Sequence, residues 1–333
     1  MRVALVLTVK NEARVLRNNL RYHRAIGAHH IFVYFDGTTD EGKATIQDLD
    51  YVTVQDSVAA ATYKQHTFLD KFTSQAAEHH TARQCLNTYD AQQQCAKMGI
   101  DWLISIDADE LVCPNIDMQV SLPEFFGDIA KGVEVVYLQT KEVLQRKSSY
   151  GNVFAEETLF KSVPTYQSRL KNIYKQFYNP FTKKKQRFSY WYGQTMGKGA
   201  IRIGQGVIPH NVHRYKKEDG STPRTRKVGF VLHYHAYDAQ DFIKKFTNFS
   251  KHPDTFLSGN AVESLKLLLR DVVNKSGMSE AALERYFEAH LMFQESEVKQ
   301  LQANRYLGVL KRSPAPLTTI HSVAAVFKSI AER

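Results

Sequence analysis

Short apolar runs alternate with longer amphipathic segments over the first 140 residues of the chain. Continuous apolar runs are typical of strands that are buried on both faces of a sheet. Segments in which apolar positions recur every three or four residues are typical of helices. The strands predicted in this way are VALVLTV (3–9), HIFVYF (30–35), YVTVQ (51–55), DWLISI (101–106) and VEVVYLQ (133–139). The helices predicted between them span 13–26, 73–98 and 122–131.

This alternation of strands and helices predicts an α/β fold with a mostly parallel sheet flanked by helices. Residues 141–227 show no clear period and are expected to be irregular, before a strand returns at VGFVLHYH (228–235). Helical patterns then recur at 238–248, 262–273, 280–293 and 322–331. The expected division is an α/β domain at 1–235, with halves at 1–140 and 141–235, and a helical C-terminal extension at 236–333.

The composition is that of a folded globular protein, since 43% of the residues are hydrophobic and 19 are Phe. No apolar run approaches the ~20 residues that cross a bilayer, and the first apolar run is too short for an export signal. The three cysteines, Cys85, Cys95 and Cys113, have no CxxC spacing. These features predict a cytoplasmic protein with reduced thiols.

The net charge of +10 is concentrated in the middle of the chain. Residues 161–230 hold 16 Lys and Arg against two acids, so this segment carries +14 and the remainder about −4. A basic segment with many aromatic residues suits phosphate-rich ligands, an anionic membrane surface or nucleic acid. Peripheral contact with the inner face of a membrane is therefore one expectation, and a solvated basic surface is the alternative.

Three carboxylates, Asp107, Asp109 and Glu110, follow the strand predicted at 101–106. Ligands of parallel sheets bind at the carboxyl ends of the strands. Alternation along a strand would point Asp107 and Asp109 to the same side, where they can share a divalent cation. Mg²⁺ and Mn²⁺ prefer such oxygen ligands, and phosphate oxygens can complete their coordination. A solvated acidic turn is the alternative.

The motifs LTVKNEARVLRNNLRYHRAIGAHHIFVYFDGTTDEG, RQCLNTYDAQQQCAKMGIDWLISIDADELV and VLHYHAYDAQDFIKKF occur in this order along the chain. Together they resemble glycosyltransferases of the GT-A type in the family 2 group. The resemblance is strongest to the branch that shares patterns with glycosyltransferase family 92. It implies a GT-A fold, a nucleotide-sugar donor, a Mn²⁺ or Mg²⁺ ion and inversion at the anomeric carbon.

The resemblance also implies which residues hold the donor. The loop after the first strand, here Lys10, Asn11 and Glu12, would bind the nucleotide, and Asp36 would meet the base or the ribose. Asn and Glu side chains can hydrogen-bond the polar edges of uracil and the ribose hydroxyls. Two alternatives stay open, because Glu12 also suits a helix N-terminus and Asp36 before a glycine also suits a turn.

A polar face runs along the helix predicted at 73–98. The family places the Arg of this helix near the donor phosphates, and here that residue is Arg83. Asn87, Asp90 and Gln94 share its face, because they follow at helical spacing. A solvent-exposed polar stripe is the alternative.

The stretch GKGAIRIGQGVIPHNVHRY resembles the Lys…Arg…His stretch of the same family. Lys198 and Arg202 would neutralise the leaving diphosphate, with His210 or His213 nearby. The glycines beside Lys198 allow a close approach of the backbone. An ordinary surface loop is the alternative.

The metal and the catalytic base are the last parts of the expected site. By resemblance, His233 joins Asp107 and Asp109 around the metal, although an isolated His is as often structural. An inverting transfer also needs a base that removes the proton of the acceptor hydroxyl. Asp238 and Glu157 rank first for this role. The further candidates are Glu110, Glu156, Asp241 and the histidines.

The predicted function is a metal-dependent, inverting transfer of a sugar from a nucleotide-sugar donor, UDP-linked more than GDP-linked, to a glycan or glycolipid. The expected context is the synthesis of a surface polysaccharide or lipopolysaccharide. One rival is a non-enzymatic protein that binds nucleic acid or an anionic polymer through the basic segment. Nucleic acid is not the expected partner, because no helix-turn-helix, RRM or zinc pattern is present. Another rival is nucleotidyl transfer at the same two-carboxylate site.

Overall fold

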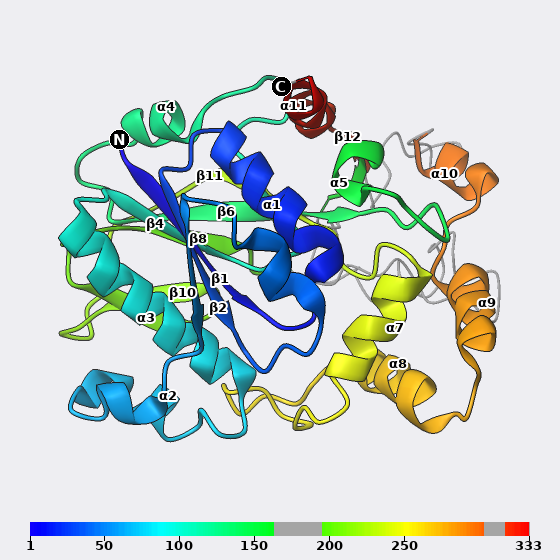
Figure 1. Ribbon diagram of the computed structural model, residues 1–333, viewed down its shortest axis with the longest axis horizontal. Helices are drawn as coiled ribbons and strands as arrows, with labels where there is room; N and C mark the ends of the chain where they lie inside the picture. The colour runs from blue at the N-terminus through cyan, green and yellow to red at the C-terminus, as the bar shows by residue number, and fades with distance from the viewer. Residues whose placement is uncertain (163–194, 303–316, 333) are drawn as a thin grey trace, which may run out of the picture.

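The computed structural model describes residues 1–162, 195–302 and 317–332 (Figure 1). The N-terminal elements are β1 (Val3–Val9), α1 (Ala13–Ala25), β2 (His30–Phe35), β3 (Val52–Asp56), α2 (Asp70–Thr73), α3 (His80–Met98), β4 (Trp102–Ile106), β5 (Glu110–Cys113) and α4 (Leu122–Gly127). The middle elements are β6 (Val135–Val143), α5 (Val153–Glu156), β7 (Leu159–Lys161), β8 (Lys198–Arg202), β9 (Val207–Asn211), β10 (Arg214–Lys217) and β11 (Thr225–His233). The C-terminal elements are α7 (Ala239–Asn248), α8 (Ser264–Lys275), α9 (Glu280–His290), α10 (Glu295–Gln302), β12 (Leu317–Thr319) and α11 (Ser322–Ala331). Three 3₁₀ helices lie at Glu41–Ile46, Ala60–Tyr63 and Thr67–Leu69.

Within the described ranges, ten strands form one sheet with the central order β12-β7-β6-β8-β4-β1-β2-β3. The strands β3, β2, β1 and β4 are all parallel. β8 runs antiparallel between β4 and β6, and β11 lies parallel to β6 and antiparallel to β5. The carboxyl ends of β1, β2 and β4 therefore meet at one edge of the sheet. The α/β fold class predicted from the sequence is confirmed.

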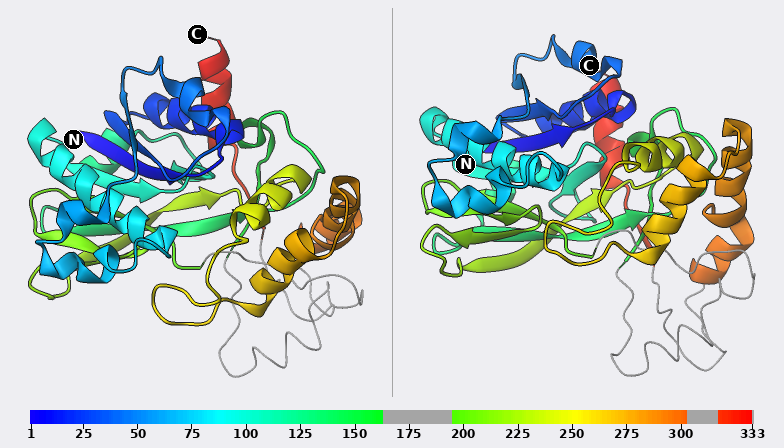
Figure 2. Two further views of the ribbon diagram at one scale, coloured as in Figure 1. Left: turned by 60° about the horizontal axis from the view of Figure 1, so that its bottom comes forward. Right: turned by 90° about the horizontal axis from the view of Figure 1, so that it is seen from below.

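Helices cover the central strands on both faces, which explains why these strands are continuously apolar. Leu5 of β1 belongs to the same buried cluster as Leu16 of α1 and Phe327 of α11. Its neighbour Val6 points to the other face and belongs to a second cluster with Ala91 of α3. Figure 2 shows α11 beside α1, although the two helices stand at opposite ends of the chain.

The predicted strands agree with the observed ones in the N-terminal part to within a few residues. The long helix predicted at 73–98 is shorter, since α3 starts at His80 and the separate helix α2 ends at Thr73. The prediction of irregular structure at 141–227 was wrong for the part that the structure describes, because β7, β8, β9 and β10 lie there. These strands are short and contain glycine and charged residues, so they carry a weak apolar signal.

The C-terminal part contains the four expected helices α7, α8, α9 and α11, together with α10, which was not predicted. It also returns to the main sheet, since β12 pairs antiparallel with β7. The expected division at residue 236 stays a prediction. No helix in the described ranges is long and apolar enough to cross a membrane. The three cysteines are free and buried.

Candidate active site

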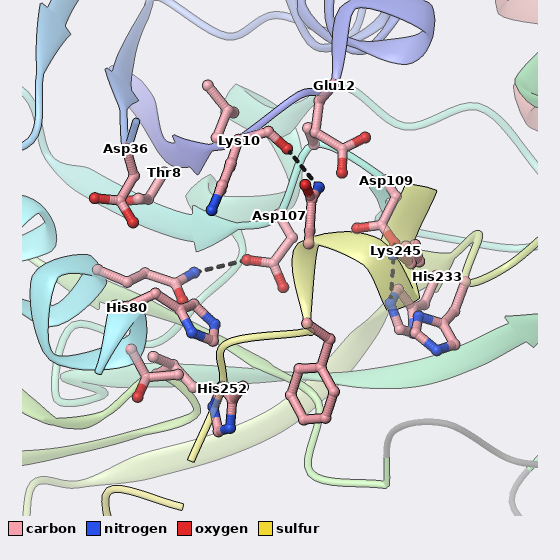
Figure 3. Close-up of a pocket in the computed structure, with 18 of the residues that line it drawn as sticks. Thr8, Lys10, Glu12, Asp36, His80, Asp107, Asp109, His233, Lys245 and His252 are labelled. Carbon is pink, nitrogen blue, oxygen red and sulfur yellow. Dashed lines mark hydrogen bonds and ion pairs between the residues drawn. The ribbon is translucent and has the colours of Figure 1, made fainter. Parts of the chain in front are cut away.

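A pocket of about 360 Å³ opens at the carboxyl ends of β1, β2, β4 and β11 (Figure 3). The N-terminus of α3 and the segment that follows α7 complete its walls. Its position is the one expected for a ligand of a parallel sheet. Eight residues that the sequence singled out line it, namely Lys10, Glu12, Asp36, Asp107, Asp109, Lys198, His213 and His233.

The acidic cluster lies in the turn between β4 and β5. The Glu110 backbone N–H donates to the Asp107 carbonyl over 3.1 Å, and the Asp107 backbone N–H donates to Glu110 Oε2 over 2.8 Å. The prediction that strand alternation orients the pair was wrong, because this turn brings Asp107 and Asp109 into the pocket. Glu110 itself is fully buried, and burial raises its pKa to about 7.

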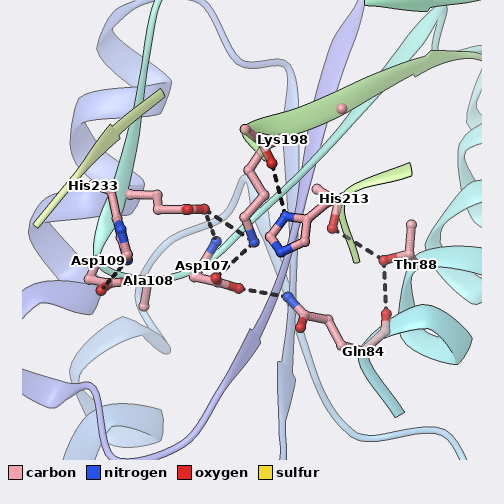
Figure 4. A network of polar contacts seen from close by, with 12 residues as sticks. Gln84, Thr88, Asp107, Ala108, Asp109, Lys198, His213 and His233 are labelled. Atoms are coloured by element: carbon pink, nitrogen blue, oxygen red, sulfur yellow. Dashed lines mark hydrogen bonds and ion pairs between the residues drawn. The ribbon is translucent and has the colours of Figure 1, made fainter. Parts of the chain in front are cut away.

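Asp107 is held by a buried lysine and a glutamine (Figure 4). Lys198 Nζ lies 2.7 Å from Asp107 Oδ2 and 3.3 Å from Glu110 Oε2, and Gln84 Nε2 donates to Asp107 Oδ1 over 2.6 Å. Burial opposes the charge of Lys198, but Asp107 and Glu110 outweigh it and hold the lysine pKa above its usual value. Lys198 is therefore a fixed cation that lines the pocket, and its role at a diphosphate stays a prediction.

The two glycines beside Lys198 allow β8 to pack closely against its neighbours. A Cβ atom at Gly197 would lie 2.1 Å from the Leu138 carbonyl oxygen, and one at Gly199 would lie 2.3 Å from the Tyr215 ring. His213 also lines the pocket, and its Nδ1 lies 2.9 Å from the Gly197 carbonyl oxygen. The close backbone approach expected for the GKG stretch is confirmed.

Asp109 is almost completely buried and is contacted by two cationic groups. The Lys245 ammonium group pairs with Asp109 Oδ2, and His233 Nε2 lies 3.2 Å from the same oxygen. Burial opposes ionisation of Asp109, but Lys245 and His233 outweigh it and hold the pKa of this carboxyl well below its usual value. Asp109 is therefore an ionised carboxylate at neutral pH.

Glu142 orients the ring of His233 from the neighbouring strand. The two residues are register partners on β6 and β11, and His233 Nδ1 lies 2.7 Å from Glu142 Oε1. Burial opposes a charge on His233, but Glu142 and Asp109 outweigh it and raise the pKa of the imidazole well above its usual value. An ionised carboxylate only accepts hydrogen bonds, so Glu142 fixes the proton on Nδ1 and directs Nε2 toward Asp109.

Three side chains of the pocket have the donor set of a metal site. In the described part of the chain, Asp109, His233 and His235 each offer a ligand atom, and these atoms lie within 4.8 Å of one another. One carboxylate and two imidazoles suit Mn²⁺ and related divalent ions. A carboxylate behind a ligating His, as Glu142 is here, is the usual support of such a ligand. Asp107, which was predicted as a ligand, lies outside this group and contacts Lys198.

The loop after β1 forms the upper wall of the pocket. Glu12 Oε2 lies 2.6 Å from Lys244 Nζ, and burial raises the pKa of this Glu to about 7 although Lys244 opposes the shift. Asn11 has a positive φ of 56°, a conformation that Asn tolerates better than most residues. Its side chain donates to Asn248 Oδ1 over 3.2 Å at the end of α7. Glu12 faces the pocket, whereas Asn11 shapes the loop.

Arg83 lies behind Asp36 and binds it through two nitrogen atoms. Nε donates to Oδ1 over 2.6 Å and Nη2 donates to Oδ2 over 2.8 Å, while Asp36 faces the pocket. Asn87, four residues along the same helix face, is fully buried and donates to Thr8 Oγ1 over 2.9 Å. The alternative of a solvent-exposed polar stripe is therefore wrong.

The structure does not bring the two candidate bases into the pocket. Asp238 is fully buried, begins α7 as its N-cap residue and accepts from Arg14 Nη2 over 2.8 Å. Glu157 is 1% exposed and accepts from Arg146 Nη2 and Tyr150 Oη, each over 2.7 Å. Both carboxylates are occupied by structural hydrogen bonds, which corrects their predicted role.

Arg202 also lies away from the pocket that it was predicted to line. Its guanidinium group stacks 4.4 Å from the centre of the Trp102 ring and donates to the Val133 carbonyl oxygen over 2.9 Å. These contacts anchor the end of β8. A role of Arg202 at the diphosphate is therefore corrected to a structural one, whereas Lys198, four residues earlier, does face the pocket.

The basic segment predicted at 161–230 lies partly outside the described residues, because 163–194 are not described. Within the described part, Lys161 and Lys198 are each only 1% exposed. These two residues therefore contribute pocket and core interactions and no basic surface.

Sequence reasoning did not single out the wall that the end of α7 and the segment after it form. The segment DFIKKFTNFSKHPDTF reads as an amphipathic helix and its continuation, in which aromatic residues are usually core. The available signal in this segment was a lysine and several regularly spaced aromatic residues, followed by a His. The pocket residues from this segment and from α8 are Lys245, Phe246, Asn248, Phe249, His252, Phe256 and Lys266.

The chain is distantly similar in sequence to two curated plant proteins. Two glycosyltransferase-like proteins of Arabidopsis thaliana are 22% identical to the chain over 322 and 330 residues. Each match covers 93% of this chain, but only 61% and 70% of the plant proteins. The chain thus spans about three fifths of the length of the first relative.

Two solved glycosyltransferases have a loosely similar structure. Glucosyl-3-phosphoglycerate synthase of Mycobacterium tuberculosis, crystallised with Mn²⁺ and UDP, is 12% identical with a TM-score of 0.33, over 76% of this chain and 80% of that one. A mannosyltransferase of Pyrobaculum calidifontis, in complex with GDP-mannose and Mn²⁺, is 13% identical with a TM-score of 0.34, over 99% and 79%.

The parallel strands and the acidic turn at their carboxyl ends form a ligand site of the kind expected for this sheet, and the family model identifies the class of protein as a glycosyltransferase. The sequence model of glycosyltransferase family 92 matches residues 7–260, which is most of the chain. The matched range includes the acidic turn and the group of Asp109, His233 and His235. The chain belongs to glycosyltransferase family 92.

Proposed function

We propose that this protein is a metal-dependent, inverting glycosyltransferase that moves a sugar from a nucleotide-sugar donor, UDP-linked by preference, to a glycan or glycolipid acceptor. The synthesis of a surface polysaccharide or lipopolysaccharide is its proposed context. The observation that carries the proposal is the group of Asp109, His233 and His235 in the same pocket as Lys198. Family membership supports sugar transfer as the reaction class.

The ion is proposed to be Mn²⁺ or Mg²⁺, held by Asp109, His233 and His235. Bound there, it supplies positive charge to the diphosphate that leaves the sugar. Glu142 keeps the ring of His233 turned toward this position through its hydrogen bond to Nδ1. Lys245, which pairs with Asp109, is proposed to exchange this partner for a donor phosphate when the ion occupies the carboxylate.

Lys198 and Lys10 both line the pocket and are proposed to supply positive charge to the diphosphate. Lys198 is buried beside Asp107, so its ammonium group needs little reorganisation to face a phosphate oxygen. Asp36, held by Arg83 through two hydrogen bonds, is proposed to accept from the base or ribose of the donor. These groups bind and orient the donor, and the base that activates the acceptor is not assigned.

Titration of UDP with and without Mn²⁺ tests the proposal. The wild-type protein should bind UDP much more tightly with Mn²⁺, and the variant Asp109→Asn should lose this metal dependence because one anionic ligand is removed. The variant Asp117→Asn is the matched control, since Asp117 is exposed and lies outside the pocket. Equal UDP affinity with and without metal in the wild-type protein would contradict the proposal.

The products of the reaction separate the proposal from its rivals. A screen of UDP- and GDP-sugars should release a nucleoside diphosphate, and proton NMR of the new glycosidic bond should show the inverted anomer. Release of pyrophosphate would instead indicate nucleotidyl transfer. Steeply salt-dependent RNA binding that survives Asp109→Asn would indicate the nucleic-acid-binding alternative.

A further inference from the structure

One wall of the pocket is a set of flat rings from the segment that follows α7. Phe249 and His252 stack with their ring centres 4.4 Å apart and an interplanar angle of 24°. Phe256 meets the edge of this pair, 6.2 Å from His252 at 67°. All three rings line the pocket that also holds the acidic turn. Figure 3 draws His252 on the opposite side of this pocket from Lys10 and Glu12.

The wall lies against the elements that hold Asp36 and the loop after β1. His252 packs 5.3 Å from His80 at the start of α3, the helix whose Arg83 binds Asp36. Asn248, one residue before Phe249, donates to the Lys10 carbonyl oxygen over 3.3 Å. The stacked rings therefore lie next to the start of α3, across the pocket from Lys10, and the Asn248 contact ties the end of α7 to the loop after β1.

The stacked pair is held in place by a buried arginine behind it. Arg270 of α8 is 9% exposed, and its Nη1 donates to the His252 carbonyl oxygen over 3.2 Å and to Asp254 Oδ1 over 2.7 Å. The same guanidinium group lies 6.0 Å from the centre of the Phe249 ring. A wall fixed in this way loses little conformational entropy when a ligand stacks on it.

His252 presents an uncharged ring. Its Nδ1 lies 2.6 Å from the Pro253 carbonyl oxygen, so this nitrogen carries the proton and donates. Partial burial lowers the pKa of His252, which keeps the imidazole neutral at neutral pH. A neutral imidazole stacked on a phenyl ring leaves an outer ring face on the pair, and such a face suits the flat face of another aromatic ring.

We propose that Phe249 and His252 form the stacking platform for the nucleobase of the donor nucleotide. The platform lines the same pocket as Asp36, beside the start of α3, while the diphosphate is proposed to lie at the acidic turn and Lys198. Stacking accepts any base, so the platform contributes affinity, and the polar groups at Asp36 select the base. This inference rests on the proposed nucleotide-sugar donor and adds the part of the protein that binds its base.

Calorimetric titration of UDP, GDP and inorganic pyrophosphate, each with Mn²⁺, tests the platform. The variant Phe249→Ala should weaken UDP and GDP by about five- to 150-fold, the range for the loss of one base–aromatic stack. The affinity for pyrophosphate should stay within about two-fold, because pyrophosphate has no base to stack. Phe249→Trp should keep UDP affinity near the wild-type value, since the flat face is retained.

The variant Lys251→Ala is the matched control, because Lys251 is exposed between the two rings in sequence and does not line the pocket. Unchanged UDP affinity in Phe249→Ala would overturn the platform, and a raised KM for the sugar acceptor would then assign the wall to that substrate. If Phe249→Ala also loses affinity for pyrophosphate, the same three titrations are repeated with His252→Ala. Weaker binding of UDP and GDP with unchanged binding of pyrophosphate then supports the platform, and unchanged UDP affinity overturns it. Wild-type protein that binds no nucleotide with Mn²⁺ would refute the proposed function itself.

Discussion

Replacing Glu142 with Gln is expected to weaken Mn²⁺ binding by about ten- to 100-fold, the usual effect of losing the partner behind a ligating His. The Glu142 carboxylate accepts from His233 Nδ1 over 2.7 Å and leaves Nε2 to face Asp109. A Gln side chain of the same shape can donate to Nδ1. This favours the tautomer with the proton on Nε2. A protonated Nε2 has no lone pair with which to bind a metal.

The magnitude corresponds to about 1.4 to 2.7 kcal/mol of binding free energy. Glu142 is 1% exposed and His233 is 8% exposed, so water cannot replace the lost hydrogen bond. We therefore expect the upper half of this range. The affinity of the wild-type protein should also rise with pH, because binding removes the proton that the raised pKa keeps on His233.

The assay is the electron paramagnetic resonance signal of free Mn²⁺, followed as protein is added at constant pH. Glu156→Gln is the control, since Glu156 pairs with the exposed Lys147 over 2.9 Å and lies outside the pocket. In a His233→Ala background, Glu142→Gln should have little further effect, because no ring is left to orient. Folded Glu142→Gln protein that binds Mn²⁺ within about two-fold of the wild type would refute this reasoning.

Two further predictions concern stability. Gly197→Ala should lower stability by about 1 to 3 kcal/mol or more, because the new Cβ would lie 2.1 Å from the Leu138 carbonyl oxygen at a φ of +70°. Gly204→Ala, with similar φ and open space, should cost less, and equal melting temperatures of the two variants would contradict the argument. His23 is fully buried, and burial lowers its pKa to about 3, so its neutral form stabilises the fold above about pH 6.5 and this contribution is lost as the pH falls. Between pH 7.5 and 5, urea unfolding should show that the free energy of unfolding of the wild type falls by about 2 kcal/mol more than that of His23→Gln. Equal decreases in the two proteins would contradict this role of His23.

The strands around the site could be predicted because burial on both faces leaves a local signal. β1 and β4 read as continuous apolar runs, and the acids that follow β4 mark the strand end that faces a ligand. The order of these motifs also indicated the family, which the comparison confirmed. The placement of Asp107 and Asp109 in one pocket was right, but it depends on a turn that strand alternation cannot reveal.

The roles of the other carboxylates depend on partners that are distant in sequence. Asp238 pairs with Arg14, 224 residues earlier in the chain, and Glu157 pairs with Arg146, which lies outside the local period at a separation of 11 residues. Nothing in the local pattern distinguishes such a neutralised acid from a free one. The wall at Phe249 was missed for a related reason, because an aromatic residue after an amphipathic helix usually packs in the core.

Because β11 lies between β5 and β6, the group of Asp109, His233 and His235 is completed only when this late strand has been synthesised. Asp109 leaves the ribosome more than one hundred residues before His233 and His235. A growing chain that ends near residue 220 therefore carries the acidic turn without either imidazole. An ion that binds as proposed needs the finished group of three, so its uptake would follow this late strand and would stabilise only the completed molecule.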